Sequence, residues 1–557
     1  MTPRRIAPRR IAPSRPTEPA VRSIWLAVLL AAASGLLGVT AFPRFGWWPM
    51  AIVSIVGITV AVHGRGVRAG LGLGYLYGWA FFGPLLAWTG TYVGPVWLLL
   101  PLAEAAFCAA LGVVLARLMR LPGAPLWLAC AWVAEEAVRD RAPFGGFPWG
   151  RWAFSQAASP LRWFAALGGA PLVTFAVALI GSGVATALIA VTARDAELNR
   201  AAERRAAIGA LAVAVAVPLL AAAVSVPLRH GRSRHVTTIA LIQGDVPDRG
   251  LEFNARRRQV LDNHVRQTLL LAAGVKAGTV AAPDLVVWPE NASDIDPFDN
   301  PDAYAQIERA VHAIDRPILV GIIRDGPGPD QDRNIGVLWS PSTGPGAQYV
   351  KRHPVPFGEY MPLRALATAL TSKANLVQDM VAGKGNGLVT GGPYPIGDVI
   401  CFEVAYDALV RSSVRAGAQL LVVQTNNATF GHSAETYQQL AMAQLRAVEF
   451  GRTVVQVSTS GLSAVIDPNG RIVARSGALF TPDRIVAQVE LETSDTLATR
   501  LGVWPELVLS DLAVIAFAGT FLARRPRRAA RAAADPSPPE PRADTDTDTD
   551  TEEMVVA

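Results

Sequence analysis

The stretch WFAALGGAPLVTFAVALIGSGVATALIAVT, residues 163–192, contains no Asp, Glu, Lys or Arg. A bilayer-spanning helix needs about 20 mostly apolar residues, so this stretch is long enough to cross a membrane. Further apolar runs lie on both sides of it. Five are clear, at residues 24–42, 69–90, 93–116, 206–225 and 502–522, and two are weaker, at residues 47–62 and 124–138. The sequence therefore predicts a multi-pass helical membrane domain of about eight spans.

The overall composition is consistent with this reading. Charged residues make up 17% of the chain and hydrophobic residues 51%, whereas about 25% of a typical soluble domain is charged. The net charge of +6 comes mostly from cations at the ends of apolar runs. Because no basic stripe is interleaved with aromatic residues, we exclude a nucleic-acid partner. Three cysteines cannot form a disulfide framework, and no metal-ligand spacing occurs, so we expect neither a metal nor a cofactor.

Arginines and lysines in short loops predict which side of a membrane each loop faces. With eight spans, one side carries 19 arginines, in the N-terminal segment, alternate loops and the segment after residue 522. The short loops of the other side carry five, namely Arg44, Arg139, Arg141, Arg151 and Arg162. We therefore expect a cell-membrane protein with both termini in the cytoplasm.

Composition divides the chain into five parts. We predict a disordered basic tail at residues 1–23, a seven-helix membrane domain at residues 24–227, an extracytoplasmic catalytic domain at residues 235–493, a last span at residues 502–522 and a second disordered tail at residues 524–557. Low-complexity tails of this kind bury too little apolar surface to fold.

One acid, Glu104, lies inside a predicted span. An ionisable residue there is costly and points to a functional role, but a helix–helix hydrogen bond explains it equally well. Both interpretations stay open at this level.

Between residues 235 and 493 the pattern changes to short β-branched runs that alternate with amphipathic stretches. The predicted strands are residues 236–243, 285–288, 318–323, 335–339, 399–402, 420–424, 453–457 and 485–489. The predicted helices are residues 256–273, 303–314, 406–416 and 433–450. This alternation predicts a layered α/β domain, and about 260 residues can bury a core without disulfides.

Three strand ends in this domain carry reactive side chains. Glu290 ends the sequence Val-Val-Trp-Pro-Glu, and Cys401 lies within Asp-Val-Ile-Cys-Phe-Glu. Lys351 follows a short strand and stands out because only four of the 51 cations are lysine. Taken singly, a cysteine in an apolar strand is usually an inert core residue, and a glutamate can cap a turn. Because α/β folds place ligands at strand ends, we interpret the three together as a candidate active site.

These motifs match a known pattern. Trp-Pro-Glu, Lys-x-His-x-Val-Pro-Phe-Gly-Glu and Ile-Cys-Phe-Glu resemble the nitrilase superfamily of carbon-nitrogen hydrolases. With apolar spans on both sides of the domain, residues 24–522 resemble the apolipoprotein N-acyltransferase family. The resemblance implies an αββα sandwich with a Glu290, Lys351 and Cys401 triad. Further roles that it implies are support by Glu359 and Glu403 and weaker substrate contacts from Phe253, Phe402 and Phe430.

The resemblance also implies the reaction. A membrane phospholipid would donate an acyl chain to Cys401, and the diacylglyceryl-cysteine at the N-terminus of a lipoprotein would accept it. The same triad would serve a membrane-tethered amidase or nitrilase that releases its thioester to water, so that alternative stays open. A transporter or scaffold with an extracytoplasmic binding domain is a third possibility, although no discontinuous repeat of the transporter kind stands out.

Overall fold

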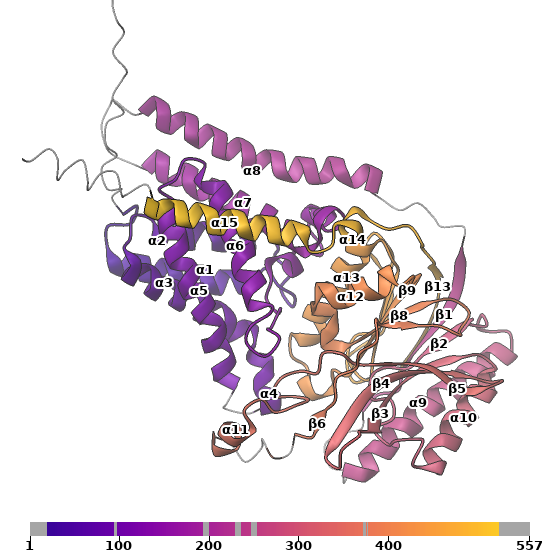
Figure 1. Cartoon of the computed structure of the whole chain (residues 1–557). Helices are drawn as coiled ribbons and strands as arrows, with labels where there is room; N and C mark the ends of the chain where they lie inside the picture. The colour runs from indigo at the N-terminus through magenta and orange to yellow at the C-terminus, as the bar shows by residue number, and fades with distance from the viewer. Residues whose placement is uncertain are drawn as a thin grey trace, which may run out of the picture.

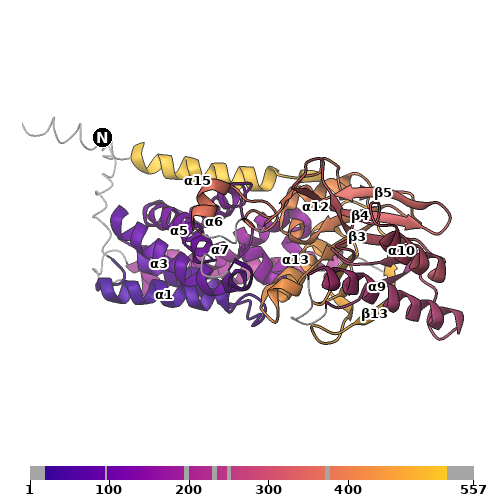
Figure 2. The same cartoon turned by 90° about the horizontal axis from the view of Figure 1, so that it is seen from below.

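The computed structural model describes residues 19–93, 97–192, 200–228, 235–246, 253–370, 375 and 377–522. Apart from residues 19–23, the two predicted tails lie outside the described residues. The described chain forms a bundle of apolar helices and an α/β domain, which lie side by side in both views (Figure 1, Figure 2).

Each apolar run predicted from the sequence overlaps a helix. The helices are α1 (Ile24–Val39), α2 (Met50–Val62), α3 (Val67–Leu85), α5 (Leu99–Leu118), α6 (Ala124–Arg139), α7 (Ala165–Thr192), α8 (Arg200–Leu228) and α15 (Trp504–Leu522), with a short α4 (Gly90–Val93) after α3. Among the described residues, four segments combine the length and the hydropathy of a membrane span: Leu99–Leu118, Pro160–Thr192, Ala207–Val226 and Trp504–Phe521. The helices α1 and α2 are apolar but shorter.

The bundle also exposes large apolar side chains. Trp25 of α1 is 76% exposed, Ile208 of α8 is 68% exposed and Ile515 of α15 is 67% exposed. Soluble monomers rarely expose large contiguous apolar patches, so these faces suit a lipid environment better than water.

The stretch at residues 163–192 lies within one candidate span, but it is not one continuous helix. A short 3-10 helix, Pro160–Phe164, precedes α7, and the backbone leaves helical geometry at Gly168 and Gly169. Gly169 has a φ of +71°, which glycine adopts without a Cβ penalty. A Cβ at Gly169 would lie 2.9 Å from Oε1 of Glu449. The break therefore lets the α/β domain approach the bundle closely.

Two sheets form the centre of the α/β domain. The first has the order β13-β1-β2-β3-β4-β5, with β6 paired to β4, and the second has the order β12-β11-β10-β9-β8-β7. The first sheet consists of β1 (Val236–Gln243), β2 (Leu285–Val287), β3 (Ile318–Asp325), β4 (Gln331–Ser340), β5 (Gly344–Val350), β6 (Asp379–Met380) and β13 (Asp483–Glu490). The second consists of β7 (Leu388–Val389), β8 (Ile396–Ile400), β9 (Leu420–Thr425), β10 (Val454–Ser458), β11 (Ala464–Ile466) and β12 (Ile472–Arg475).

Helices cover the outer face of each sheet. They are α9 (Phe253–Lys276) and α10 (Pro301–Ile314) on the first sheet, and α12 (Asp407–Arg415) and α13 (Glu435–Phe450) on the second. Strand residues alternate between the two faces. In β1, Ile239 and Leu241 enter the core between the sheets, and Ala240 and Ile242 enter the core under α9 and α10. The domain is therefore the αββα sandwich that the resemblance implied.

The helix layer of the second sheet packs against the bundle (Figure 1). Val423 of β9, Leu445 of α13 and Val177 of α7 belong to one continuous hydrophobic core. In the first sheet, Val236 at the start of β1 pairs with Glu490 at the end of β13. The chain therefore enters and leaves the sandwich at the same corner.

Candidate active site

Glu290, Lys351 and Cys401 each follow the end of a strand. Glu290 comes after β2, Lys351 after β5 of the same sheet, and Cys401 after β8 of the second sheet. Glu290 and Lys351 are buried, and Cys401 is partly buried. Lys351 donates to Glu290, which also accepts from the backbone N–H of Asn426, and the preceding residue, Thr425, donates to Sγ of Cys401. The fold therefore brings together three residues from separate segments.

The Lys351 ammonium lies between two carboxylates. Its Nζ is 3.0 Å from Oε1 of Glu290 and 2.5 Å from Oε1 of Glu359. Burial lowers the pKa of Lys351, but Glu290 and Glu359 outweigh it and raise the pKa above its ordinary value. Lys351 is therefore charged at neutral pH. An ammonium has three N–H groups, and in the described part of the chain these two carboxylates take two of them.

Cys401 stands at a sharp turn. β8 ends at Ile400 and a 3-10 helix, Cys401–Ala405, begins at once, so the predicted strand at residues 399–402 ends two residues early. Cys401 has a φ of +54°, a conformation that non-glycine residues seldom adopt and that clusters at functional sites. Its Sγ accepts hydrogen bonds from Oγ1 of Thr425 at 3.3 Å and Nε2 of Gln439 at 3.6 Å.

The electrostatics of the site keep this cysteine neutral at rest. Burial and then the carboxylate of Glu290 raise the pKa of the Cys401 thiol, while Lys351 acts in the opposite direction. Because the thiolate is the nucleophile, a base must take the proton when the sulfur attacks. Glu290 is the carboxylate whose charge acts most strongly on the thiol, which suits it to that role.

Hydrogen bonds fix the Glu290 carboxylate on both sides. Its Oε1 accepts from Nδ2 of Asn334 at 2.7 Å as well as from Lys351, and its Oε2 accepts from the backbone N–H of Asn426 at 2.8 Å. Asn334 lies in β4 and was not predicted from the sequence. The sequence signal for it was a lone amide just before a predicted apolar strand, and such a signal is weak.

The two supporting glutamates act at different places. Glu359 contacts the Lys351 ammonium directly. Glu403 instead contacts backbone: its Oε1 accepts from the N–H of Arg352 at 2.7 Å, and its Oε2 accepts from the N–H of Ile400 at 2.9 Å. Glu403 therefore ties the lysine loop to the cysteine turn and does not touch the ammonium.

A second polar cluster lies behind Cys401. Nδ2 of Asn427 donates to Oε2 of Glu435 at 2.8 Å and to Oε1 of Gln439 at 3.0 Å. Burial raises the pKa of Glu435 to about 8. Sequence reasoning missed Glu435 and Gln439, although their spacing of four residues places both on one face of a helix.

Five aromatic side chains connect the cysteine turn to the bundle, and we call them the aromatic wall: Trp88, Phe147, Trp149, Phe402 and Phe430. Phe402 stacks on Trp149 with ring centroids 5.5 Å apart. Trp88 lies 5.1 Å from Trp149 and 5.0 Å from Phe430. Two of the predicted substrate contacts, Phe402 and Phe430, therefore lie in this wall. The side chain of the third, Phe253, lies outside the described residues.

Buried charges join the two halves at a charged junction formed by Arg151, Asp407 and Arg446. Oδ1 of Asp407 accepts from Nη1 of Arg151 at 2.8 Å and from Nη2 of Arg446 at 2.6 Å. Arg151 lies in the loop after α6 and pairs with Asp140 at 3.1 Å. Arg446 also donates to the Ala405 carbonyl at 2.9 Å. The junction thus links the bundle to the turn that follows Cys401.

Glu104, whose role the sequence left open, pairs with Arg139 of α6. The Nη1 to Oε2 distance is 3.4 Å, and both side chains are buried. The same nitrogen donates to the carbonyl oxygens of Phe147 at 2.9 Å and Trp149 at 2.7 Å. These contacts favour the helix–helix interpretation and add a role in holding the aromatic wall.

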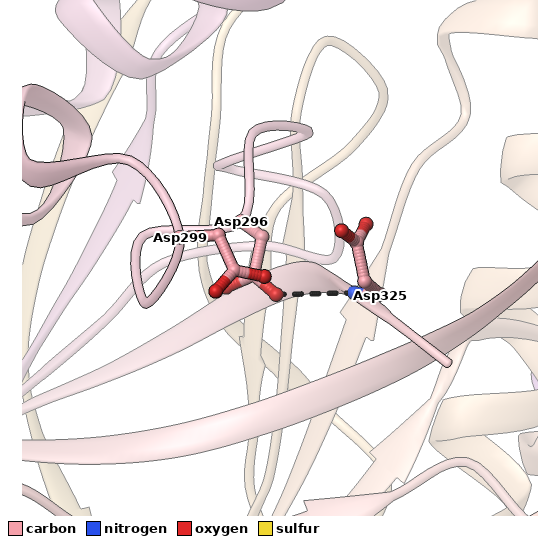
Figure 3. A group of neighbouring side chains, drawn as sticks. All are labelled: Asp296, Asp299 and Asp325. Atoms are coloured by element: carbon pink, nitrogen blue, oxygen red, sulfur yellow. Dashed lines mark hydrogen bonds between the residues drawn. The ribbon is translucent and has the colours of Figure 1, made fainter. Parts of the chain in front are cut away.

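Three aspartates, Asp296, Asp299 and Asp325, also gather near the end of β3 (Figure 3). Asp296 is buried, and Asp299 and Asp325 are exposed. The oxygens of Asp296 accept from the backbone N–H groups of Phe298 at 2.8 Å and Asp325 at 3.1 Å. These bonds to the loop account for the position of Asp296, so we assign the cluster no role in the chemistry.

Two families of known proteins match different parts of the chain. Residues 34–183 match the family of apolipoprotein N-acyltransferase N-terminal domains, and residues 238–499 match the carbon-nitrogen hydrolase family. An amidase structure from Nesterenkonia sp. covers 48% of this chain and 95% of the amidase, at 18% identity and a TM-score of 0.34.

Full-length relatives are more informative. The chain is 43% identical over 521 residues to an apolipoprotein N-acyltransferase of Mycolicibacterium smegmatis. This match covers 90% of this chain and 87% of that protein. It is 30% identical over 524 residues to an apolipoprotein N-acyltransferase of Azotobacter vinelandii, covering 91% of this chain and 97% of that protein. With these relatives along nearly its whole length, the chain belongs to the apolipoprotein N-acyltransferase family of enzymes.

Proposed function

We propose that this enzyme transfers a fatty acyl chain from a membrane phospholipid to the α-amino group of the diacylglyceryl-cysteine at the N-terminus of a lipoprotein, the final step of lipoprotein maturation. The observation that carries the proposal is the buried Lys351 ammonium, which bridges Glu290 and Glu359 and acts on the Cys401 thiol. Base, oxyanion donor and nucleophile are the three parts that acyl transfer through a thioester requires.

In the first half-reaction Glu290 takes the proton of the Cys401 thiol, and Sγ attacks the ester carbonyl carbon of the phospholipid. The remaining N–H of Lys351 donates to the oxyanion, a contribution of about 3–4 kcal/mol per donor in acyl-transfer sites. The carbonyl carbon then loses the glycerol oxygen, which receives the proton from Glu290. A lysophospholipid leaves, and a thioester remains on Cys401.

In the second half-reaction the lipoprotein amine attacks the thioester carbonyl carbon. Glu290 accepts a proton from the amine nitrogen, and Lys351 again stabilises the oxyanion. The C–S bond breaks, and Glu290 returns the proton to the departing sulfur. The products are an amide and the free thiol, so the enzyme finishes as it began.

The aromatic wall supports a lipid substrate. It begins at Phe402, the residue after Cys401, and continues through Trp149 and Trp88 toward the bundle. A fatty acyl chain on Sγ would lie against this apolar surface, out of water. Exclusion of water also favours transfer to an amine over hydrolysis.

For the membrane arrangement we propose eight spans, seven at residues 24–227 and one at residues 502–522, with both termini in the cytoplasm and the catalytic domain at residues 235–493 outside it. The arginine distribution supports this orientation. The shared corner at which β1 begins and β13 ends supports a domain tethered to one face of the membrane. The 16 residues of α1 extend about 24 Å, so its span must include flanking apolar residues to cross about 30 Å.

Mass spectrometry of full-length enzyme purified from membranes tests the reaction. We expect a long-chain acyl adduct on Cys401 that is stable in water and is lost when a diacylglyceryl lipopeptide with a free N-terminal amine is added. Cys401→Ala should carry no adduct and support no N-acylation, while Cys130→Ala, a matched change at a buried bundle cysteine, should keep both. An adduct that water discharges as fast as the lipopeptide would identify a hydrolase instead.

A further inference from the structure

We propose that the helical bundle carries a second lipid site, which binds the phosphate of an anionic phospholipid at the end of the bundle far from Cys401. A pocket of about 180 Å³ is found there. Three arginines line it, Arg65, Arg117 and Arg120, together with the apolar residues Val67, Val113 and Ala116. No acidic residue is among its lining residues. The pocket itself does not depend on the proposed reaction, but its assignment to a leaflet rests on the proposed membrane arrangement.

The course of α3 places this pocket opposite the active site. Trp88, just beyond the end of α3, belongs to the aromatic wall, whereas Arg65 lies just before its first residue. The 19 residues of α3 extend about 28 Å at 1.5 Å per residue. The hydrocarbon core of a bilayer is about 30 Å thick, so the pocket lies at the level of the other leaflet and is separate from any donor lipid at Cys401.

Close packing of two helices builds the pocket. A Cβ at Gly112 of α5 would lie 2.3 Å from the carbonyl oxygen of Gly70 of α3, and a Cβ at Gly74 would lie 2.3 Å from that of Cys108. The two helices are therefore antiparallel and nearly in backbone contact. This contact sets Arg65, before the start of α3, beside Arg117 in the last turn of α5.

Contacts with other groups hold two of these arginines, Arg65 and Arg117, in place. Arg65 donates through Nη2 to the Val21 carbonyl at 2.6 Å, and the Arg117 guanidinium lies 4.6 Å from the ring centre of Phe521. Nε of Arg65 and Nη1 of Arg117 are nevertheless buried without an acceptor in the described part of the chain. Native proteins rarely leave such donors unpaired.

A phosphate ester fits these donors. Guanidinium groups bind phosphate through paired N–H groups, and basic pockets between membrane helices bind anionic lipid head groups. The apolar lining from Val113 and Ala116 suits the glycerol and first methylenes of a lipid. A free phosphate ion would use the same donors and gain nothing from that apolar part, so we assign the pocket to the lipid.

Native mass spectrometry of the full chain in detergent tests this site. The Cys401→Ala background prevents consumption of lipid. We expect one phosphatidylglycerol to bind in preference to phosphatidylcholine, and Arg65→Gln with Arg117→Gln to weaken binding about fivefold for each arginine removed. The matched control is Arg68→Gln, an exposed arginine at the start of α3 that does not line the pocket. It should bind as the parent does.

A second variant distinguishes loss of the pocket from misfolding of the double variant. Arg117→Lys keeps the charge but not the planar fork, and should give a smaller loss of phosphatidylglycerol binding. Equal binding of phosphatidylcholine, or equal loss in Arg68→Gln and the pocket variants, would overturn the proposal. Displacement of phosphatidylglycerol by millimolar inorganic phosphate would assign the pocket to a free anion instead. Acyl transfer is measured in parallel with Arg65→Gln protein that retains Cys401. Because acyl transfer reports on the proposed function and phosphatidylglycerol binding reports on the pocket, the two proposals can fail separately.

Discussion

Asp407→Asn is expected to loosen the catalytic domain from the bundle. The asparagine keeps the shape of the side chain but removes the charge shared by Arg151 and Arg446, whose side chains are 2% and 1% exposed. Removing one partner of a buried ion pair costs about 3–5 kcal/mol. Each arginine keeps another carboxylate, Asp140 or Glu449, so we expect the lower end, about 3 kcal/mol.

This loss is large enough to measure by thermal unfolding. Domains of 150–250 residues lose about 2–4 °C in melting temperature per kcal/mol, so the variant should melt about 6–12 °C lower. Activity should also fall, because Arg446 holds the Ala405 carbonyl in the turn after Cys401. A misplacement of about 1 Å costs up to about 10²-fold in rate. We expect this in kcat of lipopeptide N-acylation, with KM for the lipopeptide little changed.

The pH dependence gives a further check. Burial opposes ionisation of Asp407, but Arg151 and Arg446 outweigh it and hold the pKa of Asp407 below its ordinary value. Stability from such a carboxylate is present above its unfolded pKa of about 3.9 and is lost only as pH falls through the lower folded value. The gap between wild type and variant should therefore stay constant from pH 5 to pH 8.

A surface ion pair supplies the control. Asp262 pairs with Arg258, and their side chains are 49% and 34% exposed. Such pairs contribute about 0–1 kcal/mol, so Asp262→Asn should melt close to wild type. If Asp407→Asn melted no lower than Asp262→Asn and kept its kcat, the charged junction would not join the two halves, and the reasoning would fail.

Three further predictions concern the site. Lys351→Arg should lower kcat at least about 10²-fold, as expected for loss of an oxyanion donor, whereas Lys384→Arg at an exposed position should not. Glu403→Gln should cost about 1.5–3 kcal/mol, the value of a hydrogen bond to a charged group, seen as a lower melting temperature and a lower kcat. For Glu435, burial raises the folded pKa to about 8, so its stabilising effect is full below the unfolded value of about 4.3 and is lost as pH rises toward 8. Melting curves should show a steeper fall from pH 5 to pH 8 in wild type than in Glu435→Gln.

Elements with a strong residue pattern could be predicted from the sequence. β1 has the predicted bounds, and α13 begins two residues later than predicted and ends at the same residue. The strands β11 and β12 have three and four residues, too few to show an alternation. The break at Gly168 and Gly169 was also missed. Hydropathy measures how apolar a stretch is, and it does not show that two glycines leave helical geometry where Glu449 of the α/β domain comes close.

In the active site, too, some residues could be predicted from the sequence and others could not. The positions of Glu290, Lys351 and Cys401 after strand ends could be predicted because each lies within a short motif that follows an apolar strand. Their catalytic roles stay predictions. Asn334 and Gln439 could not, since Asn334 contacts Glu290 across 44 positions of the chain and Gln439 contacts Cys401 across 38. Periodicity along a chain reports which face is buried, but it does not report which polar side chains meet across two sheets. The aromatic wall and the charged junction could not be predicted from the sequence either, because their members also come from distant parts of the chain.

The choice of lysine at position 351 follows from this geometry. All but four of the 51 cations are arginine, but the donors of a guanidinium lie in one plane. An ammonium can direct separate N–H groups to Glu290, to Glu359 and to an oxyanion. In the proposed mechanism Glu290 becomes neutral when it takes the thiol proton, and Lys351 would then lose one of its two counter-charges. Glu359 takes no part in that proton transfer, and its Oε1 lies 2.5 Å from Nζ. It therefore keeps Lys351 protonated at the moment when the oxyanion forms.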